Sequence, residues 1–463
     1  MTVLLRTEPH NSALWYDLPD RLRHGLVWAE SYDRESDPVR EAGSRLDVLE
    51  SQDRPTPAWR YSVVAPRLDG PEGAIRYGLT PETSKLNINV ASEQQIEQLL
   101  TPILVGLEIE SPQELINALL DWRDTDDDPR DGGAENEYYN NLDPGPAYSV
   151  KNGPLDTIEE ILLIKGWSAR LLYGEDVNRN GVLDENENDG EESFPYYDNA
   201  DGVLNHGIAP FVTVFGREPD TSLDNKPRIN LNADAATVAA QMAEYIAEGE
   251  LSEGTIAFIT QLKQQNFDFT QLASPADLYA GDAGQEAAAP AEGDADPNAP
   301  TGGELNPALA GSPVTLDELP VVMDRFSVRP PNAAAQPIVG LINVNTAPSR
   351  VLSLVPGMTA EMVVKILDGR LELEPDAAKT TAWLLTQGVL TPTEYRRIAP
   401  YITTKAYQIH VEIVGYADHR KAFYRGEWII EMLGPLAQVK YHRDLTRLGL
   451  AWPVDDDTIV VTQ

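Results

Sequence analysis

An internal repeat is the feature of this sequence that most constrains its fold. Three segments alternate apolar residues with asparagine, and they read Leu86-Asn-Ile-Asn-Val-Ala91, Ile229-Asn-Leu-Asn-Ala-Asp234 and Ile342-Asn-Val-Asn-Thr-Ala347. The alternation places the apolar side chains on one face of an extended segment, so that this face can pack inward. The asparagine side chains can hydrogen-bond to the backbone where the following helix begins. The repeat therefore predicts three strand-to-helix junctions, and we favour this structural role over a role in ligand binding.

The charge balance excludes several classes of function. The chain has 463 residues, with 36 Lys and Arg against 74 Asp and Glu, which gives a formal net charge of −38. So strong a negative charge repels phosphate groups, and it excludes sequence-independent binding to nucleic acids and to anionic membranes. Cysteine is absent, so disulfides, zinc-thiolate sites, iron–sulfur clusters and thiol catalysis are excluded as well. The length predicts two to four domains.

Composition and hydrophobic period divide the chain into six segments. Between 280 and 313 the sequence consists mostly of Ala, Gly, Pro, Asp and Glu, which cannot form a core and predicts a disordered acidic linker. The predicted organisation is an N-terminal adaptor segment at 1–58 with a short helix near Leu14–Ala29, the first part of a β-sheet at 59–91, an inserted α-helical domain at 92–279, the linker at 280–313, a second helical region at 314–402, and the last part of the sheet with a tail at 403–463.

Two pairs of alternating segments predict the sheet. Trp59–Ala65 and Ala74–Leu79 form the expected first hairpin, and Tyr407–Ile413 and Trp428–Met432 alternate in the same way near the C-terminus. Helix-start signals stand between the two pairs, such as Ser92 three residues before a glutamine, which is the pattern of a capping box. The predicted fold class is therefore α+β, with helices inserted into an antiparallel sheet.

The most specific motif lies at 176–187, where the sequence matches the calcium loop D-x-[DN]-x-[DN]-G-x5-E at every required position. The glycine in this motif allows a sharp turn that brings oxygen ligands together. The predicted calcium ligands are Asp176, Asn178, Asn180, the carbonyl of Val182, Asp184 and Glu187. A helix enters the loop but none follows it, so the motif differs from a paired sensor hand. The competing interpretation is a solvated acidic loop.

A second acidic run, from Asp124 to Glu135, is a weaker candidate. Its carboxylates follow the same template, but Pro129 replaces the required glycine, so the regular loop cannot form. The candidate ligands of this second calcium site are Asp124, Asp126, Asp128 and Glu135. The alternative is a network that ends a helix, in which Arg123 and Arg130 neutralise the acidic side chains.

Two helical hairpins, at 163–169 and 354–360, resemble the helix-hairpin-helix pattern of DNA-binding modules. Phosphate binding by that motif needs a second glycine, and Ser168 and Thr359 stand in its place, so we favour plain helical packing. The sequence contains no pattern typical of a nucleophile with its base, and its six histidines lack the spacing of a metal site. We therefore expect no catalysis.

Several motifs, taken in order, resemble one known family, the GspK proteins of the type II secretion system. The similarity is strong over 59–216 and moderate over 338–434. The motifs that carry it are Lys85-Leu-Asn-Ile-Asn, Asp121-Trp-Arg-Asp124-Thr-Asp126, Gly133-Ala-Glu135 with Tyr138-Tyr139, Lys151-Asn-Gly-Pro-Leu-Asp156, and the hairpin Glu159-Glu-Ile-Leu-Leu-Ile-Lys-Gly166. An ordered set of this kind is far more specific than any one of its members.

The resemblance implies a minor pseudopilin, a structural subunit at the tip of the periplasmic pseudopilus. It implies a pseudopilin-like antiparallel sheet with a large inserted helical domain that carries helix-hairpin-helix or SAM-like hairpins. It also implies calcium binding in that domain, at Asp176–Glu187. The expected partners are the I-type and J-type minor pseudopilins, with an H-type subunit as a further one, and the expected location is the periplasm, at the inner membrane.

Two departures from the family pattern qualify this interpretation. The N-terminal transmembrane helix with its prepilin-peptidase site is missing, so the chain as written has no anchor or signal. The segment 280–313 is additional to the pattern. Membrane association is thus expected only through the absent helix, and the alternative function is a secreted calcium-binding interaction module that is not assembled into a pilus.

Overall fold

The computed structural model describes residues 8–29, 58–70, 74–143, 145–281, 306–333, 336–417, 420–434 and 436–452. The chain divides into two compact units. Unit 1 comprises Ala13–Gly216 and the segment that begins at Tyr407, and unit 2 comprises Arg217–Ala406 with the short N-terminal segment that ends at Ser12. Helices occur in both units and an antiparallel sheet lies in unit 1, so the α+β class predicted from the sequence is confirmed.

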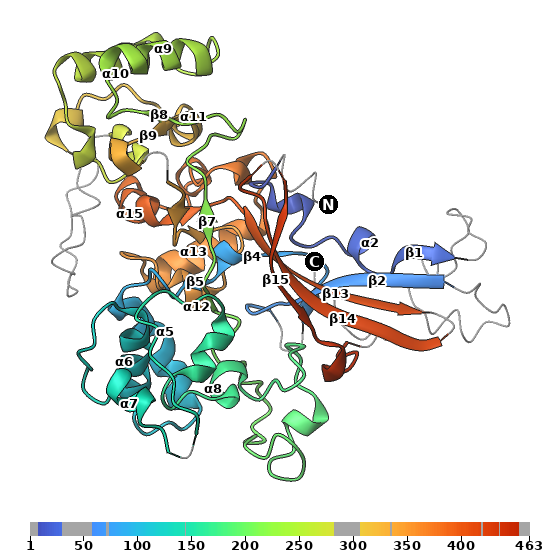
Figure 1. The fold of residues 1–463 in the computed structure, drawn as a ribbon. Helices are drawn as coiled ribbons and strands as arrows, with labels where there is room; N and C mark the ends of the chain where they lie inside the picture. Colours follow the sequence, from blue (N-terminus) through green and yellow to red (C-terminus); the bar gives the residue numbers. More distant parts are fainter. Residues whose placement is uncertain are drawn as a thin grey trace. The chain divides into compact units, whose positions relative to one another are not determined.

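The sheet of unit 1 has seven strands among the described residues, five of them in the order β1-β2-β13-β14-β15. The strands are β1 (Gly25–Ala29), β2 (Ala58–Pro66), β3 (Ile75–Arg76), β4 (Thr80–Pro81), β13 (Gln408–Ala417), β14 (Arg420–Glu431) and β15 (Gln438–Asp444). Figure 1 shows β13 and β14 as long neighbouring strands, with β2 next to β13. Segments from both ends of the chain therefore build one sheet, and the helices between them are inserted.

The two alternating pairs seen in the sequence form strands, as predicted. Ala65 pairs with Arg76 in the first hairpin, and β13 pairs with β14 along the length of both strands. The helix expected near Leu14–Ala29 is wrong in its second half, because Gly25–Ala29 forms strand β1 against β2. The backbone at His24 adopts a φ of 53°, which ends the single turn of α2 and redirects the chain into the strand.

Helices complete unit 1. They are η1 (Ser12–Leu14), α2 (Pro19–Leu22), η3 (Glu82–Ser84), α5 (Glu93–Gly106), α6 (Pro112–Arg123), α7 (Asn136–Asn140), η4 (Ile158–Leu163), α8 (Ala169–Tyr173), η5 (Glu185–Glu187) and η12 (Thr446–Leu448). Helix α5 begins with the predicted capping box, in which Ser92 Oγ accepts from the Gln95 N–H at 3.2 Å and Gln95 Oε1 accepts from the Ser92 N–H at 3.0 Å. Helices α5 and α6 pack against each other.

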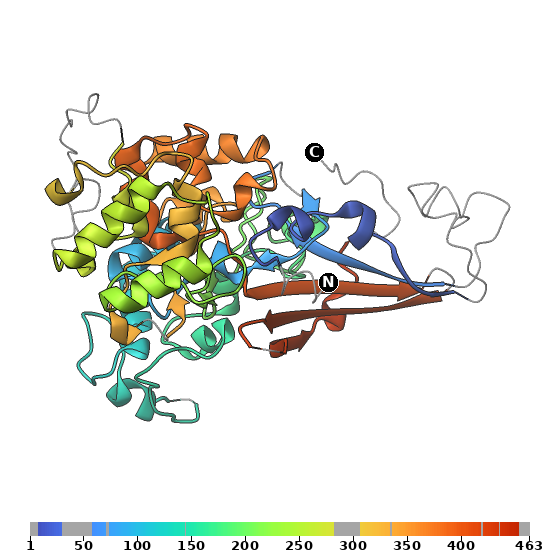
Figure 2. The same cartoon turned by 90° about the horizontal axis from the view of Figure 1, so that it is seen from above.

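Unit 2 is mainly helical around its own core. Its elements are β7 (Arg217–Glu218), α9 (Ala235–Tyr245), α10 (Glu253–Gln264), η6 (Phe269–Gln271), η7 (Pro275–Leu278), η8 (Pro307–Leu309), α11 (Leu319–Arg325), η9 (Pro331–Ala333), β10 (Ile338–Val339), α12 (Ser349–Leu352), α13 (Ala360–Leu371), η10 (Ala377–Lys379), α14 (Trp383–Thr386), α15 (Pro392–Ile398) and η11 (Ala399–Tyr401). Figure 2 shows α9 and α10 side by side. A core cluster that includes Phe269, Leu309 and Phe326 is fully buried among these elements. Within the described part of the chain, no helix has both the length and the apolar character needed to cross a membrane.

Each copy of the asparagine repeat forms the same local structure. A two-residue parallel ladder pairs the apolar-Asn dipeptide with a strand that lies far along the chain. The ladders are β5 (Leu86–Asn87) with β6 (Val212–Thr213), β8 (Ile229–Asn230) with β9 (Phe326–Ser327), and β11 (Ile342–Asn343) with β12 (Ile402–Thr403). A helix follows each copy, namely α5, α9 and α12. The three predicted strand-to-helix junctions are thus confirmed.

The first asparagine of each copy stabilises the turn. In the third copy, Asn343 Oδ1 accepts from the Asn345 N–H at 2.9 Å, and Asn343 Nδ2 donates to the Lys405 carbonyl at 3.3 Å. Asn87 and Asn230 make the equivalent pairs of bonds. The second asparagine of each copy donates to a further backbone carbonyl, that of Leu155, Val328 or Ala378. Side-chain amides therefore supply partners to backbone groups that so short a ladder leaves unpaired.

A basic side chain from a later helix also holds each turn. The three residues are Arg123 of α6, Lys263 of α10 and Arg370 of α13. They donate to the carbonyls of Ile88 and Ala91, of Leu231 and Ala233, and of Val344 and Ala347, respectively. Such bonds are charge-assisted and stronger than neutral ones. The sequence pattern did not predict these three contacts, because the distance along the chain from the turn to the basic residue differs between copies.

The structure divides the chain differently from the sequence-based segments. The adaptor segment 1–58 contributes β1 to the sheet, and the predicted helical domain at 92–279 is split between the two units at Gly216. Between Asp124 and Phe211 the helices are short, because this part is rich in Asn, Asp and Gly, whose side chains or backbone favour turns.

The predicted linker at 280–313 lies mostly outside the described residues, since 282–305 are not described. Its last part belongs to unit 2. Leu309 is fully buried in the core of that unit, and Ser312 Oγ donates to the Leu278 carbonyl at 2.5 Å. The folded structure of unit 2 therefore resumes before the predicted end of the linker at 313, because the large apolar side chain of Leu309 attaches this segment to the core.

Replacing Asn343 with alanine is expected to lower the free energy of unfolding by about 1–3 kcal/mol, because two buried backbone groups lose their partner. Urea unfolding followed by circular dichroism measures the change. Asn332→Ala, at an exposed position, serves as the matched control. An unfolding midpoint that is the same for Asn343→Ala and the control would contradict the role assigned to the repeat.

Candidate metal sites

The 176–187 loop lies in unit 1 and follows α8, which ends at Tyr173 as expected for the entering helix. Arg179 and Gly181 adopt φ values of 60° and 69°, and these left-handed conformations turn the chain back on itself. A side chain at position 181 would also collide with Pro66, because a Cβ there would lie 2.5 Å from the proline Cβ. The glycine predicted for the turn is thus required by both backbone conformation and space.

The carboxylates at the two ends of the loop accept hydrogen bonds from its backbone. Asp176 accepts from the N–H groups of Asn180 at 2.9 Å and of Gly181 at 2.8 Å. Glu187 accepts from the N–H groups of Val177 at 3.0 Å and of Asp184 at 3.2 Å. These bonds close the loop and direct both carboxylates toward it.

The remaining predicted ligands lie in the same network. Asp184 Oδ2 accepts from the side-chain amides of Asn178 at 2.5 Å and of Asn180 at 2.9 Å. The Val182 N–H donates to Asn180 Oδ1 at 2.6 Å. Hydrogen bonds therefore connect the six residues that the sequence motif predicts as ligands, and their binding of calcium stays a prediction.

The loop concentrates negative charge in a buried place. Asp176 is 7% exposed and Glu187 is fully buried. Burial raises the pKa of Asp176 to about 6, and burial together with the nearby Asp176 and Asp184 raises the pKa of Glu187 to about 7. Carboxylates in such a place favour a bound cation, because a cation compensates the cost of keeping them ionised.

A buried arginine of the sheet holds the backbone of the loop by hydrogen bonds. Arg425 of β14 donates to the carbonyls of Asn178 at 2.6 Å and Arg179 at 2.8 Å, while its Nε donates to Glu412 of β13 at 2.6 Å. The Trp452 indole N–H donates to the carbonyl of Asn180 at 3.0 Å. Three successive backbone carbonyls of the loop thus face the sheet and the C-terminal segment of unit 1.

A second concentration of carboxylates forms between α6 and α7. Asp121 lies in the last turn of α6, Asp124 caps its C-terminus, and Glu135 precedes the first residue of α7. One carboxylate oxygen from each of the three lies within 4.8 Å of the others. At this spacing, the three oxygens could bind one metal ion. We call these three residues the carboxylate cluster.

The cluster is only partly neutralised by the protein. Arg130 Nη1 lies 2.8 Å from Asp121 Oδ1 and 2.6 Å from Asp124 Oδ2, and the Ala134 N–H donates to Asp121 Oδ2 at 2.8 Å. Both oxygens of Glu135 and Oδ1 of Asp124 are buried and accept no hydrogen bond. Three carboxylates with one guanidinium leave a formal charge of −2, which matches a divalent cation.

The electrostatics of Glu135 support this fit. Its side chain is buried, with the residue 3% exposed. Burial, and then the negative charges of Asp121 and Asp124, raise the pKa of Glu135 to about 7. Gly133 permits the compact arrangement, because a Cβ at that position would lie 1.9 Å from Asp121 Oδ2.

The second predicted site is therefore rearranged. Asp124 and Glu135 lie in the carboxylate cluster as predicted, whereas Asp126 and Asp128 are exposed, with Asp126 Oδ1 accepting from the Asp128 N–H at 3.0 Å. The loop template does not apply because Pro129 prevents the turn. The alternative network is present in part, since Arg130 pairs with the acids while Arg123 instead holds the first asparagine turn.

Asp121 is the site residue that the sequence analysis missed. It stands in a stretch of α6 where every residue from Leu115 to Trp122 is buried. An acidic residue inside such a run is the signal that could have identified it, since a buried carboxylate needs a partner.

Both sites offer oxygen ligands from carboxylates and amides, without sulfur or imidazole. Hard divalent cations prefer such ligands, and Ca²⁺ accepts the irregular geometry that a loop provides. The residues present thus fit calcium at the 176–187 loop and at the carboxylate cluster.

Comparisons with known proteins were made for the whole chain. A solved structure of the GspK-GspI-GspJ complex from the type 2 secretion system of enterotoxigenic Escherichia coli is 12% identical, with 82% of this chain and 83% of that chain covered and a TM-score of 0.29. At that level the similarity adds nothing to the assignment. No curated protein matches the chain significantly.

A family model matches one segment of the chain. Residues 79–173 match the model of type II secretion system (T2SS) protein K. The matched segment contains the first asparagine turn, α5, α6 and the whole carboxylate cluster. Over this segment, the chain is similar to protein K of the type II secretion system.

Proposed function

We propose that this chain is a minor pseudopilin, a structural subunit of the tip of the periplasmic pseudopilus, and not an enzyme. The observation that carries the proposal is the match of residues 79–173 to protein K of the type II secretion system. The sheet of unit 1, built from both ends of the chain with helices inserted, is consistent with the pseudopilin-like architecture that the family resemblance implies.

Calcium is the cofactor we propose, bound at the 176–187 loop and at the carboxylate cluster. Buried ionised carboxylates without a counter-charge destabilise a fold, so a bound divalent cation would stabilise unit 1. If a site binds calcium with a dissociation constant of about 10 μM, calcium at about 1 mM adds roughly 2.7 kcal/mol to the free energy of unfolding. The role of the ion is structural, because no reacting group of a substrate needs to approach it.

The proposed partners are the I-type and J-type minor pseudopilins. The family resemblance of the sequence implies both of these partners. The alternative function is a secreted calcium-binding module. It would have the same metal sites as the proposed pseudopilin, but it would not assemble into a pilus.

The carboxylate cluster can be tested with Glu135→Gln. The neutral amide removes one of the two uncompensated negative charges, so the increase in melting temperature caused by calcium should fall. Differential scanning calorimetry with calcium and with a chelator measures this increase, and isothermal titration calorimetry counts the ions bound.

The matched control for the cluster is Asp126→Asn. Asp126 belongs to the same acidic run but is exposed and lies outside the cluster. The two variants should differ, with one ion lost in Glu135→Gln and none in Asp126→Asn. The same calcium response in both variants would overturn the assignment of the cluster.

The loop can be tested independently with Asp176→Ala. This change removes the first predicted ligand and two backbone hydrogen bonds, so most of the calcium response that belongs to the loop should be lost. Glu185→Gln, at an exposed position of the same loop, is the control. The assignment of this site fails if Asp176→Ala binds as many calcium ions as Glu185→Gln does.

Assembly distinguishes the pseudopilin from the alternative module. The purified chain, saturated with calcium, is expected to co-elute in size-exclusion chromatography with I-type and J-type minor pseudopilins from the same source. Removal of calcium should weaken this association if the metal sites hold the binding surface in shape. Separate elution of well-folded proteins would argue for the module.

A further inference from the structure

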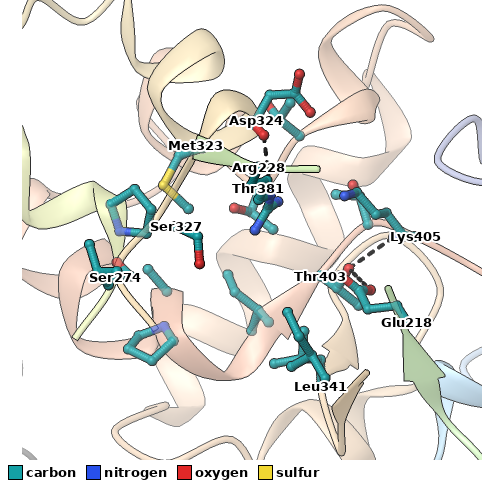
Figure 3. Close-up of a pocket in the computed structure, with 18 of the residues that line it drawn as sticks. Glu218, Arg228, Ser274, Met323, Asp324, Ser327, Leu341, Thr381, Thr403 and Lys405 are labelled. Carbon is teal, nitrogen blue, oxygen red and sulfur yellow. Dashed lines mark hydrogen bonds between the residues drawn. The ribbon is translucent and has the colours of Figure 1, made fainter. Parts of the chain in front are cut away.

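A pocket in unit 2 lies outside both candidate metal sites. It has a volume of about 260 Å³, and residues of β7, β9, β10 and β12 contribute to its wall. Figure 3 shows that its side chains come from distant parts of the sequence, with Met323 and Ser274 on one side of the space and Thr403 and Lys405 on the other. The pocket belongs entirely to the unit that spans Arg217–Ala406.

The charge of the pocket is opposite to that of the chain. Four basic residues and two acidic residues line it, so its formal charge is two positive units, whereas the chain as a whole carries −38. The basic residues are Arg228, Arg329, Lys379 and Lys405. Basic side chains are scarce in this sequence, and their convergence on one cavity indicates a place for an anionic group.

The two carboxylates of the wall already have hydrogen-bond partners. Glu218 accepts from the Thr403 hydroxyl at 2.6 Å, and Asp324 accepts from the Leu223 N–H at 2.7 Å. Both are buried. They are therefore fixed elements of the wall, held in place by other groups.

The two arginines donate to backbone carbonyls, Arg228 to that of Asp324 at 3.1 Å and Arg329 to that of Gln336 at 2.9 Å, and they share one carboxylate. Arg228 lies 3.6 Å from Asp220, and Arg329 lies 3.5 Å from the same carboxylate, so one acid serves two guanidinium groups. Asp220 is not part of the lining. Its charge reduces the surplus in and around the pocket to one positive unit, which a single carboxylate would balance.

The two lysines of the lining come from the C-terminal part of the Arg217–Ala406 segment. Lys405 is 4% exposed and donates to the Thr221 carbonyl. Burial, and then the charge of Arg228, lower the pKa of Lys405 to about 8. Lys379 lies 2.6 Å from Asp376, but that carboxylate is 93% exposed, and so solvated a pair compensates little charge.

Hydroxyl and apolar side chains form the rest of the wall, and the apolar ones include Met323, Ile338 and Leu341. A cavity of about 150 Å³ with apolar walls holds a benzene molecule. The larger volume here therefore accommodates a carboxylate together with a short aliphatic chain or a small side chain. A ligand without an apolar part would leave this portion of the wall uncovered.

We propose that this pocket binds a carboxylate attached to a short apolar body. The carboxylate lies among the basic side chains, and the apolar body covers Met323 and Leu341. Two sources offer this chemistry, a free aliphatic carboxylic acid and the C-terminal end of a polypeptide whose last side chain is apolar. The proposal does not depend on the assembly of the chain into a pilus.

The test uses the full chain and hexanoate as the probe, with 1-hexanol as its uncharged counterpart. Saturation-transfer NMR should show hexanoate bound, with an affinity about tenfold or more above that of hexanol, since a charged hydrogen bond contributes about one tenfold step or more. Acetyl-alanyl-leucine with a free C-terminus, compared with its amide, then distinguishes the sources. Binding of the free peptide in preference to the amide identifies the polypeptide end, whereas binding of hexanoate alone identifies the small acid.

Two variants locate the binding. Lys379→Met removes a half-exposed charge, and Lys405→Met removes a buried one, so the former keeps the test valid if the latter fails to fold. Each should weaken hexanoate binding about tenfold. Lys365→Met, on α13 and outside the lining, is the control and should leave the affinity unchanged. The proposal is overturned if hexanol binds as well as hexanoate, if no probe binds, or if the folded pocket variants bind hexanoate like the control.

Discussion

The hydrogen bonds made by asparagine at the three turns are the interactions on which the rest of the structure depends. A parallel ladder of two residues leaves most of its backbone groups without partners, and it cannot persist alone. Asn343 supplies one acceptor and one donor to these groups, and Arg370 adds two charge-assisted bonds to the same turn. Because each ladder joins segments far apart in the chain, these side chains fix the positions of the helices that follow. The same device appears in both units, so it defines a repeated building block.

The carboxylate cluster arises from one modification of that building block. In each copy, the residue two positions before the basic side chain lies near the end of a helix: Asp121, Gln261 and Asp368. Gln261 and Asp368 are exposed, whereas Asp121 is fully buried. The difference comes from the segment after α6, which folds back so that Arg130 and Ala134 donate to Asp121 and Glu135 approaches it. A position that is solvated in two copies has thus become a metal-binding candidate in the first, within the segment that matches protein K.

The sequence predicts the parts of this protein that follow local chemistry. The capping box at Ser92, the alternating strands β13 and β14 and the three turns all depend on short patterns, and the structure contains each of them. The sharp turn at Gly181 in the 176–187 motif is present as well, whereas calcium binding by its residues stays a prediction. Two of the three residues of the carboxylate cluster were predicted, and Asp121 was missed because it enters the cluster through a tertiary contact that no spacing rule describes. Strand β1 was missed for a similar reason, since Gly25–Ala29 becomes a strand by pairing with β2. Residues that act across long sequence separations, such as Arg370 and Arg425, carry no local signal at all.

Arg425 shows why the loop and the sheet cannot be considered separately. A guanidinium has five donors and no acceptor, and burying it is costly unless those donors are used. Here its bonds go to Glu412 within the sheet and to the carbonyls of Asn178 and Arg179 in the loop. Burial raises the pKa of Glu412 to about 7, although the charge of Arg425 acts in the opposite direction. Desolvation of the carboxylate therefore outweighs its attraction to the arginine. The loop carbonyls offset part of that cost. A conformational change that moved them would leave the arginine with unused donors, so the shape of the loop and the integrity of the sheet are linked through one side chain.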